Sequence, residues 1–246
     1  MAIICFLLRA KFIFFYAHFI GFMENILEVD SINKSFGEKK ILTDVFLRCE
    51  VGDVIGVFGS NGSGKSTLLK IIYGTLQAEN KFIRLNNKVT NEAYKIKNGI
   101  AYLPQQHFIP TNLTVQKVIT LSINPNKKDE FLRDAMINSI IDSKIGSLSG
   151  GELKYLHVKL ILFSEAHFCL LDEPYSGISP IIAALINHQI AAQSKTKGII
   201  IADHHYAYLL EIATKLYLLK DGVGKFIQHQ AELITSGYLK KGMLTE

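Results

Sequence analysis

The sequence predicts an α/β fold whose core is a mainly parallel sheet flanked by helices. Residues 54–58 are a continuous apolar run, which is typical of a strand buried on both faces of a parallel sheet. A glycine-rich loop follows, and residues 67–73 then show the apolar spacing of a helix. Residues 168–172 form a second apolar run, which ends in acidic side chains. A strand, a glycine loop, a helix and a further buried strand together indicate the parallel core.

The composition indicates one folded unit with subdomains. The 246 residues are 48% hydrophobic and 20% charged, as is ordinary for a globular protein. The cysteines are odd in number and widely spaced, at Cys5, Cys49 and Cys169. We therefore expect neither a disulfide framework nor a zinc site, and we expect the protein to occupy a reducing compartment. The net charge of +5 is modest and the basic residues are scattered, so we expect no nucleic-acid partner.

The first 22 residues differ from the rest of the chain because they are strongly apolar. Arg9 and Lys11 near their middle argue against a transmembrane helix, since each would cost about 2.5 to 3.5 kcal/mol on insertion. The placing of charged and small residues is also not that of a signal peptide. We interpret residues 1–22 as a hydrophobic extension upstream of a true start at Met23. A peripheral membrane anchor and a poorly ordered tail are the alternatives.

The most informative motif is the glycine-rich loop. It matches G-x-x-x-x-G-K-[ST], in which backbone N–H groups and the positive end of a helix surround phosphate groups. In this pattern the ammonium of Lys65 contacts the phosphates and the hydroxyl of Ser66 binds Mg²⁺. The loop therefore predicts that the chain binds a nucleoside triphosphate. Its residues are Gly59, Ser60, Asn61, Gly62, Ser63, Gly64, Lys65, Ser66 and Thr67.

Two carboxylates stand where the second apolar run ends. Asp172 is its last residue, and Glu173 follows immediately before Pro174. Ligands of open parallel sheets bind at the carboxyl ends of the strands, where these side chains emerge. We expect Asp172 to support Mg²⁺ and Glu173 to orient an attacking water. Taken alone, the pair is more often an exposed acidic turn, but the phosphate loop upstream favours the catalytic interpretation.

A second candidate anion site begins at Ser149. Ser149 is suited to cap the apolar, helix-spaced run that continues through Leu162, and Gly150 and Gly151 leave backbone N–H groups accessible. Alone, this pattern indicates no more than a serine-capped helix. Together with the phosphate loop and the acidic strand end, the pentapeptide at residues 148–152 resembles the signature of the nucleotide-binding domain of ATP-binding cassette (ABC) proteins.

The resemblance covers about residues 26–235 and implies one ABC ATP-binding domain over residues 23–246. Such a domain has a P-loop NTPase core with a mainly parallel sheet, an antiparallel β subdomain and a helical subdomain. We expect the antiparallel part near residues 26–50 and the helical subdomain at about residues 106–162.

The resemblance also implies sites for residues that have no strong signal of their own. Phe36 lies where family members place an aromatic ring against adenine, and an ordinary core residue is the alternative. Gln105 follows Pro104 in a segment that resembles the glutamine loop, and we prefer it to Gln106. His204 follows the last apolar run and resembles the switch histidine that meets the γ-phosphate. The residues implied for the metal are Ser66, Gln105 and Asp172.

In this family, two domains enclose two ATP molecules head to tail. Lys65 of one domain and residues 149–151 of the other then hold the same nucleotide, so a single chain contains half of each site. The resemblance implies in-line attack of water on the γ-phosphate, with Glu173 and His204 as catalytic residues and with Mg²⁺. It also implies two kinds of partner, namely a second ABC domain in a homodimer or heterodimer and a separate transmembrane permease.

Some positions depart from the family pattern. Ser179 stands where the loop after the acidic strand end usually has Asp, which alters a contact across the dimer. The signature helix commonly carries arginines, whereas this chain has Lys154 and Lys159 nearby.

Further elements are predicted locally. Within the insert, a turn is expected at residues 127–130 and a helix over residues 131–141. Residues 216–219 and 225–227 predict a terminal hairpin, followed by a helical tail.

We therefore expect an ATP-binding and ATP-hydrolysing subunit of an ABC transporter, cytoplasmic and peripheral on the inner face of the cell membrane. Its compact size and terminal hairpin resemble export and branched-chain-uptake cassettes. The alternative is a soluble ABC-type nucleotide switch that regulates a protein or nucleic-acid partner without transport. A P-loop kinase is a third hypothesis, but it leaves the signature pentapeptide unexplained.

Overall fold

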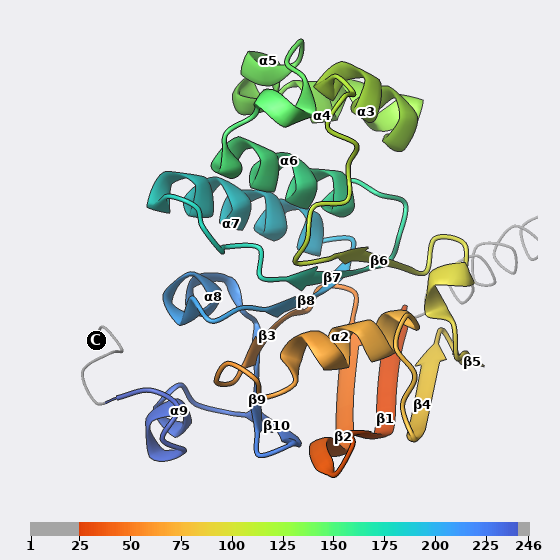
Figure 1. Ribbon diagram of the computed structural model, residues 1–246, viewed down its shortest axis with the longest axis vertical. Coiled ribbons are helices and arrows are strands. Elements are labelled where there is room, and N and C mark those ends of the chain that lie inside the picture. Colours follow the sequence, from red (N-terminus) through yellow and green to blue (C-terminus); the bar gives the residue numbers. More distant parts are fainter. Residues whose placement is uncertain (1–24, 241–246) are drawn as a thin grey trace, which may run out of the picture.

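The computed structural model describes residues 25–240, so the expectations for residues 1–22 and for a start at Met23 lie outside the described part. Two sheets are joined through helix α2 (Lys65–Tyr73), and the other long helices cover the far side of the larger sheet (Figure 1). This arrangement confirms the predicted α/β class with a mainly parallel core and an antiparallel portion.

The smaller sheet is antiparallel, with the strand order β2-β1-β4-β5. Its strands are β1 (Ile26–Phe36), β2 (Lys39–Glu50), β4 (Asn80–Leu85) and β5 (Lys88–Val89). The first two are the antiparallel pair expected near residues 26–50, whereas β4 and β5 add a hairpin that the sequence analysis missed. Asn86 and Asn87 form its turn with φ angles of 49° and 63°, a left-handed pair that suits a two-residue hairpin.

The larger sheet has the strand order β10-β9-β3-β8-β7-β6. Its strands are β3 (Val54–Phe58), β6 (Ile100–Leu103), β7 (Phe168–Asp172), β8 (Gly198–Ala202), β9 (Lys215–Lys220) and β10 (Val223–Ile227). All neighbours pair in parallel except β9 and β10, which form the predicted terminal hairpin. Only β8 separates β3 from β7, so the phosphate loop and the acidic strand end emerge at the same edge.

Each face of the larger sheet has its own hydrophobic core. Along β7, Phe168 and Leu170 belong to the core shared with α2, while Cys169 and Leu171 belong to the core on the opposite face. The helices on that opposite face are α6 (Gly150–Leu162), α7 (Pro180–Ser194) and α8 (Tyr206–Ile212). Because both faces are covered, the central strands are buried at every position, and the polar residue among them is Asp172 at the end of β7.

The segment before α6 forms short helices that lie farthest from the sheets in Figure 1. They are α3 (Val115–Ser122), α4 (Pro125–Leu132) and α5 (Ala135–Ile140), and single 3₁₀ turns occur at η1 (Ala93–Lys95) and η2 (Ile145–Ser147). The predicted turn at 127–130 and the predicted single helix over 131–141 are both wrong. Asn124 caps a helix that runs through the expected turn, and Asp134 accepts a hydrogen bond from Ile137 N and so starts a new one.

The C-terminal part of the described chain returns to the phosphate loop. The expected helical tail contains one short helix, α9 (Ala231–Thr235). Beyond it, the ring of Tyr238 meets that of Phe58 edge-on, with centroids 6.0 Å apart. Gly59, His204 and Tyr238 line one hollow of about 320 Å³ beside the loop.

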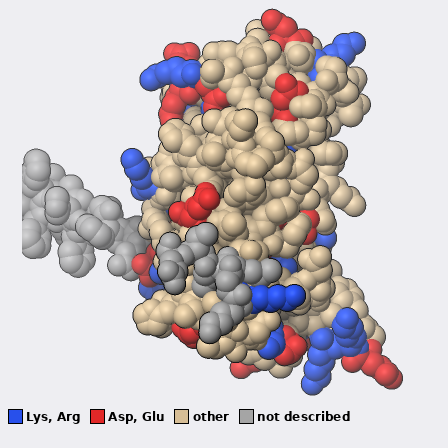
Figure 2. All heavy atoms as spheres, turned by 90° about the vertical axis from the view of Figure 1, so that its left-hand side faces the viewer, with Lys and Arg blue, Asp and Glu red and all other residues tan. Residues whose placement is uncertain are grey.

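The surface carries interspersed charges on the face that Figure 2 shows. Basic and acidic side chains of the described residues alternate there, without the continuous basic stripe that favours a nucleic-acid backbone. Within residues 25–240, no helix has the length and apolar character needed to cross a membrane.

Candidate functional site

The phosphate loop joins β3 to α2 through glycines in left-handed conformations. Gly62 and Gly64 have φ angles of 80° and 103°, where a side chain would be strained. Gly64 is the N-cap of α2 and supplies no side-chain cap, which leaves N–H groups of the first turn for an anion. The hydroxyl of Ser63 is buried without a hydrogen-bond partner among the described residues. A phosphate oxygen would satisfy it, so the loop fits a bound phosphate.

Lys65 is the buried cation of this loop. Its Nζ donates hydrogen bonds to the carbonyl oxygens of Gly59 at 2.6 Å and Ser60 at 3.2 Å. Burial lowers the pKa of Lys65, and the carboxylates of Glu173, Asp203 and Asp172 oppose that shift. The ammonium thus lies against the carbonyl oxygens of the loop, within electrostatic range of the acidic strand end, and it is a cation that can neutralise a polyphosphate.

Asp172, at the end of β7, joins two other elements. Ser66 Oγ of α2 donates to its Oδ1 at 2.8 Å, and the Tyr102 hydroxyl of β6 donates to its Oδ2 at 2.9 Å. Burial raises the pKa of Asp172, while these two hydrogen bonds act in the opposite direction. Hydroxyl and carboxylate oxygens are the ligands that Mg²⁺ prefers, so this pair fits the metal that accompanies a nucleotide.

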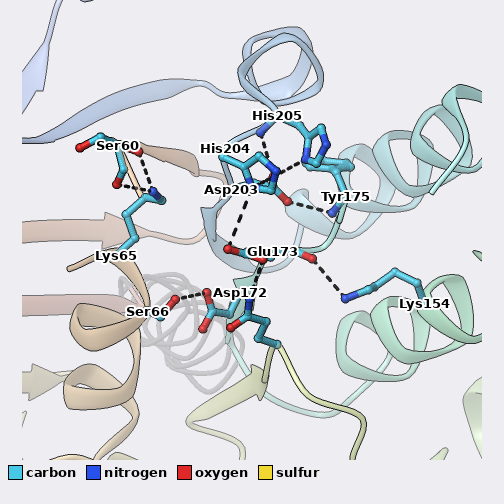
Figure 3. Close-up of polar contacts among 12 residues, drawn as sticks. Ser60, Lys65, Ser66, Lys154, Asp172, Glu173, Tyr175, Asp203, His204 and His205 are labelled. Carbon is cyan, nitrogen blue, oxygen red and sulfur yellow. Dashed lines mark hydrogen bonds and ion pairs between the residues drawn. The ribbon is translucent and has the colours of Figure 1, made fainter. Parts of the chain in front are cut away.

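Glu173 is held by residues from several elements (Figure 3). Its φ of 52° places a non-glycine residue in the left-handed region, and its N–H donates to Ala202 O at 2.8 Å. Gln105 Nε2 donates to one carboxylate oxygen, Oε2, at 2.8 Å. His204 Nδ1 lies 4.0 Å from the other, Oε1. The structure therefore brings the predicted glutamine and the predicted histidine to the same carboxylate.

Asp203 distinguishes the two adjacent histidines. It is fully buried and accepts hydrogen bonds from the backbone N–H groups of Tyr175 and His205, both at 2.9 Å. The Nδ1 atom of His205 also lies 2.8 Å from Asp203 Oδ1, whereas that of His204 is 3.6 Å away. His205 is thus occupied by Asp203, and His204 is the histidine within reach of Glu173.

Phe36 lies at the end of β1 with 52% of its surface exposed. This exposure excludes the alternative that it is an ordinary core residue. Lys34 Nζ stands 4.9 Å from the ring centroid, a cation–π contact. An exposed aromatic ring of this kind can stack on a base, and that role stays a prediction.

The signature residues lie at the start of α6. Ser149 and Glu152 form a capping box: Glu152 Oε2 accepts from Ser149 N and Ser149 Oγ, each at 2.8 Å, and Ser149 Oγ accepts from Glu152 N at 3.4 Å. The side-chain hydrogen bond from Ser149 is the main cause that lowers the pKa of Glu152. A Cβ added at Gly150 would meet open space, and one added at Gly151 would stand 3.5 Å from Ile182.

Apart from Phe36 at the end of β1, the predicted site residues fall into two groups. Those around the phosphate loop meet at one edge of the larger sheet, and the signature residues bond only locally at the N-terminus of α6. Three contacts of the first group were not predicted from the sequence: Tyr102 with Asp172, Asp203 with His205, and Lys154 with the Glu173 carbonyl. Tyr102 precedes the glutamine loop and Asp203 precedes the histidines, so both had a local signal. Lys154 had none.

The fold and the loop define the class of P-loop proteins that bind nucleoside triphosphates. A profile of the ABC transporter family matches residues 42–176, just over half of the chain. The chain therefore belongs to this family, as one of its ATP-binding subunits with ATPase activity.

Individual relatives are similar over most of the chain. It is 33% identical over 215 residues to a probable ABC transporter ATP-binding protein of Azorhizobium caulinodans, covering 81% of this chain and 75% of that one. It is 29% identical over 217 residues to the lipopolysaccharide export system ATP-binding protein LptB of Haemophilus influenzae, covering 82% and 89%. Among solved structures, a nucleotide-free ATP-binding cassette from an ABC transporter matches with a TM-score of 0.75 at 25% identity, covering 88% and 96%.

Proposed function

We propose that this subunit hydrolyses ATP at an interface between two ABC domains and thereby drives a separate membrane permease. In this proposal Lys65 and the loop amides bind the triphosphate, Phe36 stacks on adenine, and Glu173 and His204 act on the γ-phosphate. The observation that carries it is the convergence of Gln105 and His204 on the Glu173 carboxylate, directly beside Asp172.

A magnesium ion belongs to this proposal. Ser66, Asp172 and Gln105 are the residues that would hold it, and they offer the hard oxygen donors that the ion requires. When bound, Mg²⁺ would neutralise charge that develops on the phosphate oxygens.

The chemistry then follows from the protein's own groups. The Glu173 carboxylate orients a water molecule and accepts its proton while the water oxygen bonds to the γ-phosphorus. The bond from that phosphorus to the bridging oxygen of ADP breaks, and inorganic phosphate is released. His204 contacts the γ-phosphate, and Lys65 with the loop amides stabilises the charge.

A second ABC domain would complete the site. The side-chain hydrogen bonds of Ser149 are with Glu152, and a Cβ added at Gly150 would meet open space. The N–H groups at the start of α6 are therefore accessible to an anion from another molecule. This geometry supports a head-to-tail dimer, formed with an identical or a similar domain.

The permease would contact a groove beside the glutamine loop. The groove has a volume of about 410 Å³, and its lining includes Phe108, Leu113 and Leu121. Phe108 is 46% exposed and follows Gln105 by three residues, while Leu121 is 66% exposed. Exposed apolar side chains around a hollow favour a protein partner. Such a partner would place the subunit in the cytoplasm, peripheral on the inner face of the cell membrane.

The test uses tagged Glu173→Gln protein, because removal of the base should trap the ATP-bound dimer. We expect hydrolysis to fall about 10²- to 10⁴-fold while ATP binding persists. The variant is expressed in its native cell and recovered with ATP from detergent-solubilised membranes, and co-purifying chains are identified by mass spectrometry. The control is the Glu173→Gln/Lys65→Ala double variant, which should not retain ATP.

Two outcomes separate the candidate functions. A stoichiometric multi-span protein that is recovered with Glu173→Gln and lost in the control supports the transporter proposal. Recovery from the soluble fraction alone, or with soluble proteins, contradicts it and favours the nucleotide switch. A monomer in excess ATP and Mg²⁺ would contradict the head-to-tail dimer.

A further inference from the structure

Lys154 is a buried cation that the proposed mechanism does not yet use. It lies on α6, one turn after the signature, and is 7% exposed. Its Nζ donates a hydrogen bond to the backbone carbonyl of Glu173 at 3.2 Å. Figure 3 shows Lys154 extending from α6 to this carbonyl. Lysine side chains normally keep the ammonium in water, so a lysine that points inward to one carbonyl needs an explanation.

The surroundings of Lys154 compensate its burial electrostatically. Burial lowers the pKa of Lys154, and the carboxylates of Asp203, Glu173 and Asp172 oppose the shift. These carboxylates come from β7, the residue after β7 and the residue after β8. The ammonium of Lys154 therefore offsets the negative charge of these carboxylates, in addition to its place in the packing of α6.

Glu173 requires external support for its conformation. Its φ of 52° is unfavourable for a side-chain-bearing residue, so neighbouring contacts must hold it. The N–H of Glu173 donates a hydrogen bond to Ala202 O. The carbonyl oxygen of Glu173 accepts one hydrogen bond from Lys154 Nζ and another from Ser176 N, the latter at 3.4 Å. Of the two donors to the carbonyl, Lys154 alone comes from another element and carries a charge.

We propose that Lys154 is a positioning residue, whose ammonium holds the Glu173 carbonyl and with it the backbone conformation that directs the Glu173 carboxylate. This inference rests on the proposed role of Glu173 as the general base. Since Ser149 caps α6 and Lys154 lies in that helix, a shift of the helix when the signature meets a nucleotide would also shift Lys154. The contact thus links the signature of one site to the base of the other.

The test compares steady-state ATP hydrolysis by the full chain and by Lys154→Met, which keeps the length of the side chain and loses its charge. We expect kcat to fall about tenfold to a hundredfold, as for a misplaced catalytic group, and KM for ATP to change less than about twofold. Lys154→Arg can still donate to the carbonyl and should recover most of the rate. Should Lys154→Met fail to fold, Lys154→Gln takes its place.

Two further variants separate positioning from stability. Lys159→Met removes another buried lysine of α6, whose Nζ contacts Asp134 at 2.6 Å instead of Glu173. It should lower the melting temperature and leave kcat of the folded protein unchanged. Adding Lys154→Met to Glu173→Gln should cause no further loss of rate, because Lys154 acts through Glu173.

The results that overturn the inference are distinct from those that overturn the proposed function. A wild-type kcat in Lys154→Met, an arginine variant as slow as the methionine variant, or multiplicative losses in the double variant would each reject positioning. Glu173→Gln that hydrolyses ATP at the wild-type rate would instead reject the proposed role of Glu173 itself.

Discussion

The phosphate-loop side and the signature side of this chain differ in how their polar groups are satisfied. On the phosphate-loop side, hydrogen bonds join residues far apart in sequence, as between Ser66 and Asp172 or Gln105 and Glu173. On the signature side, the capping box joins Ser149 to Glu152 within one helical turn. The first region is assembled by the tertiary fold, and the second is built by local helix chemistry.

This difference reflects two ways in which one chain can position polar groups for a ligand. Side chains that must meet in a fixed geometry are held by contacts between α2 and the ends of the parallel strands β6, β7 and β8. Backbone N–H groups at a helix start need no such bracing, since the helix itself aligns them. The chain therefore carries one candidate site assembled by tertiary hydrogen bonds and one built at a helix start.

The largest effect should come from blocking the site at the start of α6 with Gly150→Glu. A Cβ at Gly150 meets open space within the chain, so the substitution should leave the fold intact. In the Glu173→Gln background we expect it to abolish the ATP-dependent dimer, because a carboxylate would occupy the place of a phosphate. Light scattering after size exclusion measures this, with the exposed Asn126→Glu as a charge-matched control. A Gly150→Glu dimer as stable as that of Glu173→Gln alone would contradict the proposal that the start of α6 binds an anion from another molecule.

A smaller effect is expected on the assembled side from Lys65→Ala. Loss of the ammonium that lies within the phosphate loop should weaken ATP binding by about a hundredfold. The exposed Lys70→Ala on the same helix is the matched control and should bind normally. Calorimetric titration of the monomer gives both affinities. Full affinity in Lys65→Ala would show that the phosphate loop is wrongly assigned.

The smallest effect concerns the stability of α6 in acid. His157 is 2% exposed and stacks on Phe108 with centroids 4.7 Å apart. Burial, followed by the charges of His107 and Lys154, lowers the pKa of His157 to about 4. The unfolded histidine has a pKa near 6.5, so the unfolded state binds the proton first as pH falls, and the native state loses stability between those values.

Replacing this histidine should remove that loss. We expect the free energy of unfolding of the wild type to fall from pH 7 to pH 5 by about 1 to 2 kcal/mol more than that of His157→Leu. Urea unfolding at the two values measures the difference. Parallel pH dependence in both proteins would place the titration on other groups.

The fold could be predicted from sequence where the signal is local and repeated. The buried strands β3 and β7 have uninterrupted apolar runs, and the glycine loop marks the start of α2. The hairpin of β4 and β5 was missed because its two-residue turn is Asn86-Asn87 and its second strand has two residues. The break at Asp134 was missed because one capping side chain outweighs a helical pattern that continues on both sides.

The site shows the same limit. Lys65, Asp172 and Glu173 lie in motifs whose spacing is short, so they were found. The choice between His204 and His205 depends on a contact between the ends of two strands, since His204 Nδ1 lies 4.0 Å from Glu173 Oε1 while His205 is bonded to its neighbour Asp203. Lys154 is one of many lysines in the sequence. Its contact with Glu173 joins residues 19 apart, on α6 and just after β7, so it could not be predicted from a local pattern.

The placement of Tyr238 against Phe58, beside Gly59, has an optical consequence. The chain contains no tryptophan. A single tryptophan introduced at position 238 would therefore be the sole indole fluorophore of the protein, and its emission would report on the environment of the phosphate loop without any attached dye. The returning C-terminal segment thus offers a built-in observation point from which nucleotide arrival and departure can be timed in solution.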